Sequence, residues 1–370
     1  YLLIKTIRIK FYSMKKNNIA IIGGSGFLGS RLAKRLNNKK ASLKIFDKKK
    51  CNEDISEIDI EKPESLNQLE GTDTLINLAA LHRDDIKPIT RYDDVNVRGS
   101  VNICNVARKY KINKIIFTSS VAIYGFAPPN TDESGEPNYF NDYGRTKYLA
   151  EQVYKEWHAE DPENRTLVIV RPTVIFGEGN RGNVYNLLKQ IASRKFVMFG
   201  NGKNIKSMAY VENVAAFLEY STLFDSGLHI YNYIDKPDFD MNKLISMTRN
   251  TLFNKYNVGI RLPAFLGIVI GYFADLISKI TGINLPISSI RVKKFMGTTK
   301  FSSSIDQTDF IKPISLEDAL IKTLHYEFLE DNSEKFKKQK IIVFDLSEDQ
   351  FDDFLNPIIL HLKKLNENSK

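Results

Sequence analysis

A glycine-rich segment, GGSGFLG at residues 23–29, constrains the fold of this chain more than any other feature. It follows a short apolar run at residues 19–22 and opens an amphipathic helical pattern at residues 27–36. Glycine is needed where the backbone turns sharply and where it must approach another group without a Cβ in the way. A strand, a tight turn and a helix in this order predict the start of a parallel sheet covered by helices.

Short strand-like runs and amphipathic helical patterns alternate through the first half of the chain. The expected strands are residues 19–22, 43–46, 74–78, 114–118 and 166–170, and the expected helices are residues 27–36, 93–110 and 143–157. Parallel strands need this alternation, because each connecting helix carries the chain back across one face of the sheet. We therefore predict an α/β fold with a doubly wound parallel sheet of the Rossmann type and a smaller C-terminal substrate-binding lobe.

Composition sets limits on the function. Lys and Arg number 53 against 44 Asp and Glu, and the formal net charge of +9 is spread along the sequence. This distribution is typical of a solvated surface, leaves room for attraction of an anionic substrate, and gives no indication of nucleic-acid binding. The two cysteines, Cys51 and Cys104, are too few for a disulfide framework or a metal cluster. We predict no bound metal and a reducing, cytoplasmic location.

The most apolar stretch of the chain, residues 262–280, is interrupted by Pro263, two glycines and Asp275. It is shorter than the roughly 20 clean apolar residues that a membrane span needs. We predict a buried or lobe-capping helix at this place and no membrane span. Contact with a membrane surface is the alternative that the sequence leaves open.

Gly24, Gly26 and Gly29 match the dinucleotide-binding fingerprint G-x-G-x-x-G. The helix that follows offers free N–H groups and a positive dipole to a pyrophosphate. The turn therefore predicts a dinucleotide cofactor. Its cofactor-binding residues are expected to be Gly23, Gly24, Gly26, Phe27, Leu28 and Gly29.

Asp47 ends the second expected strand, at about the 20-residue distance where a carboxylate accepts hydrogen bonds from the adenosine ribose. The same carboxylate repels the 2′-phosphate of NADP, so NAD is the predicted cofactor. Three lysines follow Asp47 at once and could offset that repulsion. Asp59 and Ile60 come after a short polar loop, and we expect them beside the adenine amino group.

Tyr143 and Lys147 lie four residues apart at the start of an expected helix, which places them on one face. A phenol titrates near about pH 10, but a neighbouring ammonium and a cationic nicotinamide both favour its ionised form. Tyr143 could then exchange a proton with a sugar hydroxyl while hydride moves between the same carbon and NAD. Ser120 follows the strand expected at residues 114–118, where open α/β sheets bind ligands, and its hydroxyl could hold the reacting oxygen.

Four parts are expected along the chain. A NAD-binding Rossmann domain covers residues 14–172, and the substrate-binding lobe covers residues 173–330, with a strand-like run at residues 228–233 that can return to the sheet. Residues 1–13 are expected to be a non-native or disordered extension. Residues 331–370 form a tail whose role the sequence does not indicate.

In these motifs the sequence resembles the extended short-chain dehydrogenases, a family that includes nucleotide-sugar 4-epimerases, 4,6-dehydratases and 4-ketoreductases. The resemblance covers about residues 18–325, and it implies that Ser120, Tyr143 and Lys147 are catalytic. It also implies cofactor contacts from Leu78, Ala79, Ala80, Asn96, Tyr143 and Lys147. The segment Arg171-Pro172 is similar to the one that leads into the family's substrate lobe.

The resemblance is softer in the expected substrate lobe. Asn183 stands where the family holds the nucleotide diphosphate, and Lys206 stands where many members carry a phosphate-binding arginine. Lysine meets phosphate as a point charge and lacks the bidentate fork of arginine. The alternatives are a helix N-cap for Asn183 and an exposed charge for Lys206. With Ser120, these two residues are the expected substrate contacts.

The resemblance implies a NAD-dependent 4-epimerase of a UDP-hexose or UDP-N-acetylhexosamine, an isomerase of surface-polysaccharide biosynthesis that oxidises C4 and then re-reduces it. One alternative is an oxidoreductase that uses NAD(P)H to reduce a UDP-4-keto-6-deoxy sugar. A non-catalytic NAD-binding regulator is a third, and the complete catalytic set argues against it. Val121 and Ala122 stand where dehydratases carry an acidic pair, so dehydration is not expected. The protein is also expected to form a homodimer.

Overall fold

The computed structural model describes residues 17–37, 42–51, 53–83, 86–281 and 289–330. The predicted N-terminal extension and the predicted C-terminal tail lie outside the described residues. The described residues up to Leu329 belong to one compact unit.

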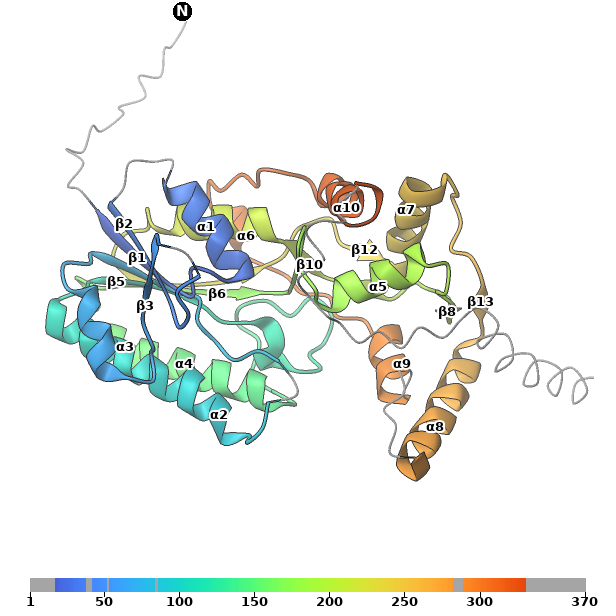
Figure 1. Cartoon of the computed structure of the whole chain (residues 1–370), viewed down its shortest axis with the longest axis horizontal. Helices are drawn as coiled ribbons and strands as arrows, with labels where there is room; N and C mark the ends of the chain where they lie inside the picture. Colours follow the sequence, from blue (N-terminus) through green and yellow to red (C-terminus); the bar gives the residue numbers. More distant parts are fainter. Residues whose placement is uncertain (1–16, 38–41, 52, 84–85, 282–288, 331–370) are drawn as a thin grey trace, which may run out of the picture. The chain divides into compact units, whose positions relative to one another are not determined.

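Seven parallel strands form the main sheet, in the order β11-β6-β5-β4-β1-β2-β3 (Figure 1). The strands are β1 (Asn18–Ile22), β2 (Ser42–Asp47), β3 (Ile55–Glu57), β4 (Thr74–Asn77), β5 (Lys114–Thr118), β6 (Thr166–Pro172) and β11 (Gly227–Tyr233). Their order runs outward from β1 in both directions, which confirms the predicted doubly wound sheet. Strand β11 pairs with β6 along its whole length, so the chain beyond residue 172 contributes to this sheet. A domain boundary at that residue stays a prediction.

Helices cover both faces of the main sheet (Figure 1). They are α1 (Phe27–Asn37) and α6 (Val211–Ser221) on one face, and α3 (Gly99–Tyr110) and α4 (Asp142–Ala159) on the other. Within β1, Ile19 and Ile21 pack in the core under α1 and α6, whereas Ala20 and Ile22 pack in the core under α3 and α4. Burial on both faces explains why this strand is apolar along its length.

The helix predicted at residues 93–110 starts earlier than expected and is not regular. It begins as α2 (Thr90–Tyr92), passes through a π-helical turn at Asp93–Arg98, and continues as α3. Single-turn 3-10 helices lie at Val121–Tyr124 and Ile305–Gln307, a longer 3-10 helix lies at Pro63–Leu69, and a second π-helical turn lies at His325–Leu329.

The second half of the chain builds another apolar core beside the sheet. Its helices are α5 (Asn183–Ala192), α7 (Met241–Phe253), α8 (Ala264–Thr281), α9 (Ser289–Met296) and α10 (Leu316–Leu324). Its short strands are β7 (Val174–Phe176), β8 (Met198–Phe199), β9 (Ile205–Lys206), β10 (Met208–Tyr210), β12 (Phe239–Asp240) and β13 (Arg261–Leu262), which pair as β10-β7, β12-β9 and β13-β8. No helix among the described residues is long and apolar enough to cross a membrane.

Candidate active site

The glycine turn between β1 and α1 is held against the next strand. The backbone N–H groups of Gly23 and Gly24 both donate to the carbonyl oxygen of Phe46, at 2.9 Å each. Gly23 has a φ of +83°, which only glycine adopts without strain, and a Cβ on Gly29 would lie 2.2 Å from the Gly23 carbonyl oxygen. The turn is therefore possible only with glycine at these positions.

The segment after β4 closes over the same turn. A Cβ on Gly23 would lie 2.9 Å from the backbone nitrogen of Ala79 and 3.0 Å from the carbonyl carbon of Leu78. The Leu78 N–H donates to the Ile22 carbonyl oxygen at 2.9 Å, which fixes this segment at the carboxyl end of β1. Leu78, Ala79 and the glycine turn therefore form one backbone-lined edge, next to Ala80. Such an edge, with the N-terminus of α1 at its side, fits a dinucleotide pyrophosphate.

Asp47 is fixed at the tip of β2 beside the turn. Its carboxylate accepts hydrogen bonds from the backbone N–H of Ser25 at 3.0 Å and of Lys48 at 2.7 Å. Each carboxylate oxygen has a second lone pair, so Asp47 can still accept from ribose hydroxyls. These residues fit NAD, and Asp47 is the carboxylate that would hold its adenosine ribose.

The side chain of Lys48 points to other carboxylates rather than standing free beside the ribose position. Its ammonium lies 3.2 Å from Asp59 and 2.7 Å from Glu61, and the hydrogen bond to Glu61 raises the pKa of Lys48. This lysine is therefore neutralised locally and offers little compensation for a 2′-phosphate. Ile60 lies in the core instead, with its side chain against Gly99 and its carbonyl oxygen accepting from Asn102 at 2.9 Å.

The start of α4 brings Tyr143 next to the segment that carries Ser120. Asn141 is the N-cap of α4, and its side-chain oxygen accepts from the Gly144 N–H at 2.9 Å. A Cβ on Gly144 would lie only 2.5 Å from the carbonyl oxygen of Ala122, so the first turn of α4 touches the 3-10 turn after β5. Ser120 caps that 3-10 turn by accepting from the Ala122 N–H at 3.1 Å.

Lys147 lies one helical turn beyond Tyr143, and it is almost fully buried, at 3% exposure. Its ammonium donates to the Thr118 carbonyl oxygen at 2.7 Å and lies 4.7 Å from the centre of the Phe117 ring. Burial lowers the pKa of Lys147 to about 7, and the nearby carboxylate of Glu151 opposes this effect. The charge of Lys147 therefore depends on the groups around it.

Two buried hydroxyl oxygens also lie at the carboxyl end of β5. The side-chain oxygens of Thr118 and Ser119 have no hydrogen-bond partner among the described residues. Buried polar groups are normally satisfied by protein, water or a ligand. Unpartnered hydroxyls beside Lys147, at the edge of the sheet where ligands bind, fit a site that holds a polar cofactor or substrate.

Asn96 forms hydrogen bonds with two segments that border the site. Its amide group donates to the Leu81 carbonyl oxygen at 3.1 Å and to the Thr146 hydroxyl at 3.0 Å, and it accepts from the Leu81 N–H at 2.9 Å. Both amide hydrogens are therefore used to tie the segment after β4 to α4. Asn96 thereby holds Thr146, the residue next to Lys147 on α4.

Sequence reasoning missed a buried ion pair between α4 and β6. The guanidinium of Arg171 on β6 binds the carboxylate of Glu151 on α4 at 2.9 and 2.7 Å, and it donates to the Tyr124 hydroxyl at 2.6 Å. That hydroxyl donates in turn to Asn232 at 2.9 Å. The available signal was the position of Glu151, four residues after Lys147 on the same face of α4.

The two predicted substrate residues lie on separate elements of the second half. Asn183 is exposed at the first position of α5, and the N-cap is Gly182, so the alternative that Asn183 itself caps the helix is wrong. Lys206 is half-buried on β9, where burial lowers its pKa to about 8. The alternative of an exposed charge at Lys206 is therefore also wrong.

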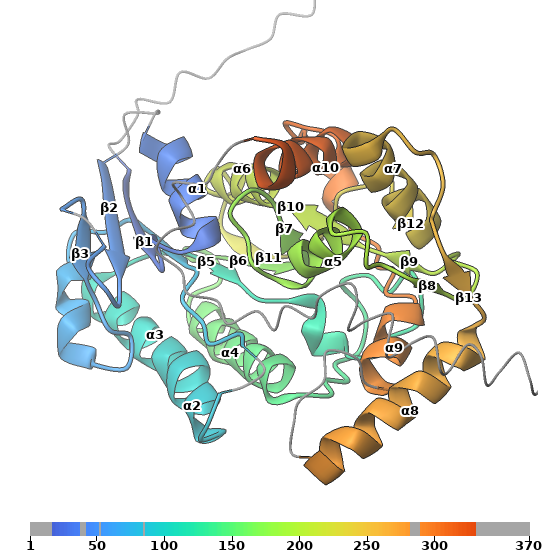
Figure 2. The ribbon, with the colours of Figure 1, turned by 45° about the vertical axis from the view of Figure 1, so that its right-hand side comes forward.

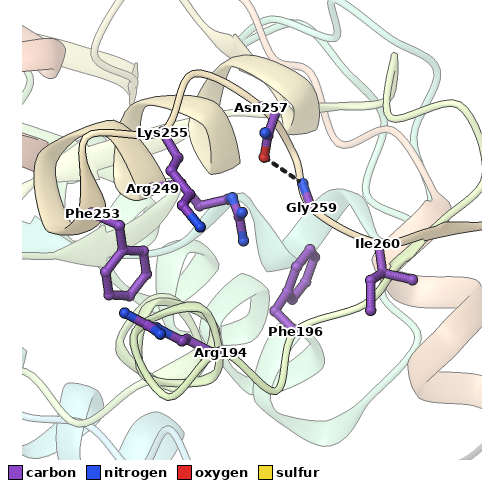
Figure 3. A pocket seen from close by; sticks show the side chains of 8 residues that line it. All are labelled: Arg194, Phe196, Arg249, Phe253, Lys255, Asn257, Gly259 and Ile260. Atoms are coloured by element: carbon purple, nitrogen blue, oxygen red, sulfur yellow. Dashed lines mark hydrogen bonds between the residues drawn. The ribbon is translucent and has the colours of Figure 1, made fainter.

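A pocket of about 540 Å³ lies between α5, α7 and the segment that leads to β13 (Figure 3). It is lined by Arg194, Phe196, Arg249, Phe253, Lys255, Asn257, Gly259 and Ile260. The Arg194 guanidinium lies 4.9 Å from the centre of the Phe253 ring, and Gly259 donates its N–H to the Asn257 side chain at 3.1 Å. None of the predicted catalytic or substrate residues lines this pocket, so we do not place the reaction there.

Comparison with known proteins shows the family to which this chain belongs. Residues 19–232 match the model of the NAD dependent epimerase/dehydratase family. The chain therefore belongs to this family, and the predicted family, enzyme class and NAD cofactor are confirmed. The described site residues from Gly23 to Lys206 lie within the matched segment.

Particular relatives extend over nearly the whole length of the chain. It is 46% identical over 319 residues to the N-acetyl-alpha-D-glucosaminyl-diphospho-ditrans,octacis-undecaprenol 4-epimerase of Escherichia coli O157:H7, covering 85% of this chain and 96% of that protein. Among solved structures, it resembles the UDP-N-acetylglucosamine 4-epimerase of Methanobrevibacter ruminantium M1 with a TM-score of 0.64, 21% identity, and coverage of 85% and 98% of the two chains. The UDP-glucose 4-epimerase of Thermotoga maritima gives 0.65, 18% identity, and 84% and 98%. These two structures support the fold.

Proposed function

We propose that this protein epimerises C4 of an N-acetylhexosamine that is joined through a diphosphate to a polyprenol. The observation that carries the proposal is the similarity to the Escherichia coli relative, which covers almost all of that protein and whose substrate is a sugar on diphospho-undecaprenol. The 4-epimerase predicted from the sequence is confirmed by this similarity. Of the predicted UDP-hexose and UDP-N-acetylhexosamine substrates, the proposal keeps the N-acetylhexosamine and the diphosphate and puts a polyprenol in place of the nucleoside.

Three residues of the chain perform the proposed proton chemistry. Tyr143 takes the proton of the C4 hydroxyl and later returns it, and Ser120 holds the same oxygen by a hydrogen bond. Lys147 has three N–H donors, of which one is used by Thr118, and its positive charge favours the ionised phenol of Tyr143. NAD, when bound beside the glycine turn, would supply the hydride acceptor and donor that C4 needs. Because the second transfer reaches the opposite face, the 4-keto sugar must turn within the site between the two steps.

The diphosphate is the part of the substrate that must stay bound while the sugar turns. Lys206 and Asn183 are the residues we assign to it. Lys206 is half-buried on β9, and a lysine can meet a phosphate as a point charge. The division at residue 172 into a NAD-binding part and a substrate lobe, the homodimer and the cytoplasmic location are part of this proposal.

UDP-N-acetylhexosamine is the second candidate substrate, because two of the similar solved structures are UDP-sugar 4-epimerases. Purified protein would be incubated without added cofactor with N-acetylglucosaminyl-diphospho-undecaprenol in detergent and, separately, with UDP-N-acetylglucosamine. Released sugars would be identified by proton NMR, with Tyr143→Phe as the inactive control. Formation of N-acetylgalactosamine from the lipid-linked sugar alone supports the proposal, and formation from the UDP sugar alone supports the second candidate. If neither changes but a UDP-4-keto-6-deoxy sugar is reduced as NAD(P)H is oxidised, the protein is a reductase.

A further inference from the structure

Helix α8 exposes its large apolar side chains. Six of them recur at helical spacing and are each more than half exposed: Phe265, Val269, Tyr272, Phe273, Leu276 and Ile280. We call this stripe the α8 face. Its positions are three or four residues apart, so they lie on one side of the helix. At 1.5 Å per residue the stripe is about 22 Å long.

The opposite side of α8 is lined by small residues and faces the protein. Gly267, Gly271 and Ala274 are buried, again at spacings of four and three. A Cβ on Gly267 would lie 2.7 Å from the Phe199 ring and 3.1 Å from Val292, so the absence of side chains lets α8 approach β8 and α9 closely. A helix at the surface of a protein in water normally has the reverse arrangement, with large apolar residues inward.

Cationic and amphipathic groups border the α8 face. Lys279 lies in the last turn of α8, and Lys293 on α9 donates to the Tyr272 hydroxyl at 2.9 Å, with its ammonium 5.1 Å from the centre of that ring. The carboxylate of Asp275 accepts from the Ser289 N–H at 3.2 Å. An apolar stripe with a tyrosine and lysines at its border is the pattern of helices that lie in the interface of an anionic bilayer.

The α8 face is also linked to the predicted diphosphate site. After α9 the chain reaches Thr299, whose N–H donates to Ile205 and whose carbonyl oxygen accepts from Ser207, both at 2.9 Å. Thr299 therefore pairs with the strand that carries Lys206. Figure 2 shows α8 and α9 side by side at the end of the molecule where β8 and β13 lie.

We propose that the α8 face docks the protein on the surface of an anionic phospholipid bilayer. This inference rests on the proposed function, because a polyprenol-linked sugar diphosphate is held at a bilayer surface by its lipid chain. The large side chains of α8 insert among the acyl chains, and Lys279 and Lys293 meet the anionic headgroups. The pairing of Thr299 with β9 then keeps Lys206 on the part of the protein that meets a substrate held in the membrane.

Co-sedimentation of the full chain with lipid vesicles tests this docking. Wild type is expected to bind vesicles that contain phosphatidylglycerol, and to bind pure phosphatidylcholine vesicles less. The double variant Phe265→Ser, Phe273→Ser should bind phosphatidylglycerol vesicles at least about tenfold more weakly, which corresponds to about 1.4 kcal/mol. The matched control is Leu223→Ser, Ile311→Ser, two exposed apolar residues outside α8, and it should bind like wild type. Equal binding by the α8 variant and wild type would overturn the proposal.

A second copy of the chain is the competing occupant of the α8 face. Sedimentation velocity without vesicles distinguishes a second copy from a membrane. The membrane proposal is overturned if wild type is a dimer, the α8 variant is a monomer, and neither binds vesicles. A separate activity assay tests the proposed function by itself. Its substrate is a water-soluble short-chain prenyl diphosphate that carries N-acetylglucosamine. Wild type and the α8 variant should epimerise it equally, while only the variant loses activity on the undecaprenyl substrate in vesicles. If wild type cannot epimerise the short-chain substrate, the proposed function fails whatever the vesicles show.

Discussion

Helices α4 and α8 have the same length, 18 residues, and bury opposite kinds of side chains. Helix α4 turns charged and large groups inward, among them Lys147, Glu151 and Trp157. Helix α8 turns glycines and an alanine inward and leaves Phe265 and Phe273 exposed. The apolar content of a helix therefore does not determine which way it faces.

The difference follows from what each helix packs against. The charged groups of α4 find partners inside the protein: Lys147 donates to Thr118, and Glu151 binds Arg171. Burying a charge is costly unless the charge is paired and hydrogen-bonded, and of these two residues only Glu151 meets both conditions. The six side chains of the α8 face stay more than half exposed, and the small residues on the opposite side bring the helix backbone close to β8 and α9. Helix α4 carries the proposed catalytic residues, and helix α8 carries the proposed docking surface.

The largest expected effect concerns the proposed acid–base role of Tyr143 on α4. Tyr143→Phe should lower turnover by about 10²- to 10⁴-fold, the range for a lost acid–base group, while NAD binding and the melting temperature stay close to wild type. Tyr148→Phe, the same change five residues along the same helix, is the matched control and should keep near-normal turnover. Steady-state kinetics and NAD fluorescence titration measure both. Near-normal turnover of Tyr143→Phe would mean that α4 does not carry the acid–base group.

The second effect concerns the charge that α4 buries. Arg171→Met leaves the fully buried Glu151 without its cation, and this should lower the free energy of unfolding by about 3–5 kcal/mol. Arg108→Met breaks a pair at the exposed end of the same helix, where Arg108 and Glu160 are both more than a third exposed, and should cost no more than about 1 kcal/mol. Urea unfolding compares the two variants. Equal losses would show that burial does not set the strength of these pairs.

The third effect concerns replacement of Lys147, which should change both the stability and the turnover of the protein. Burial lowers the pKa of Lys147 to about 7 in the folded chain, against its ordinary 10.5, so the unfolded chain binds more protons between these pH values. Burying the charged lysine therefore lowers the free energy of unfolding fully below pH 7. This loss is relieved as the pH rises toward 10.5. Lys147→Met should raise the free energy of unfolding at pH 7 by more than about 1 kcal/mol, although turnover falls. It should also flatten the alkaline rise in melting temperature. A less stable variant would contradict this account.

The sheet and the placement of Tyr143 and Lys147 together on α4 could be predicted from the sequence because their signals are local. Burial on both faces makes β1 apolar throughout, and the turn after it requires glycine at Gly23 and Gly29 whatever the rest of the chain does. Tyr143 and Lys147 lie four residues apart, and this spacing alone puts them on one face of a helix. Each of these features needs only residues that are neighbours in sequence.

The partners of these residues could not be predicted, because they meet only after distant elements pack. Arg171 reaches Glu151 across β6 and α4, and Lys48 reaches Asp59 rather than the ribose site. The orientation of α8 was missed for another reason: prediction followed its apolar residues, which indicate burial in water-soluble proteins. The spacing of its small residues, such as Gly267, was the signal that pointed to the buried side.

The smallest expected effect tests the other half of the comparison. Phe273 is already exposed in the folded chain, so replacing it removes little apolar burial, and Phe273→Ser should change the free energy of unfolding by no more than about 0.5 kcal/mol. Phe217→Ser, at a fully buried position of α6, is the control and should cost about 3–5 kcal/mol. Both are measured by urea unfolding of the full chain at low protein concentration. A loss above about 2 kcal/mol for Phe273→Ser would mean that this side chain is covered in the folded protein. In that case α8 would face a protein surface as α4 does, and the contrast between the two helices would disappear.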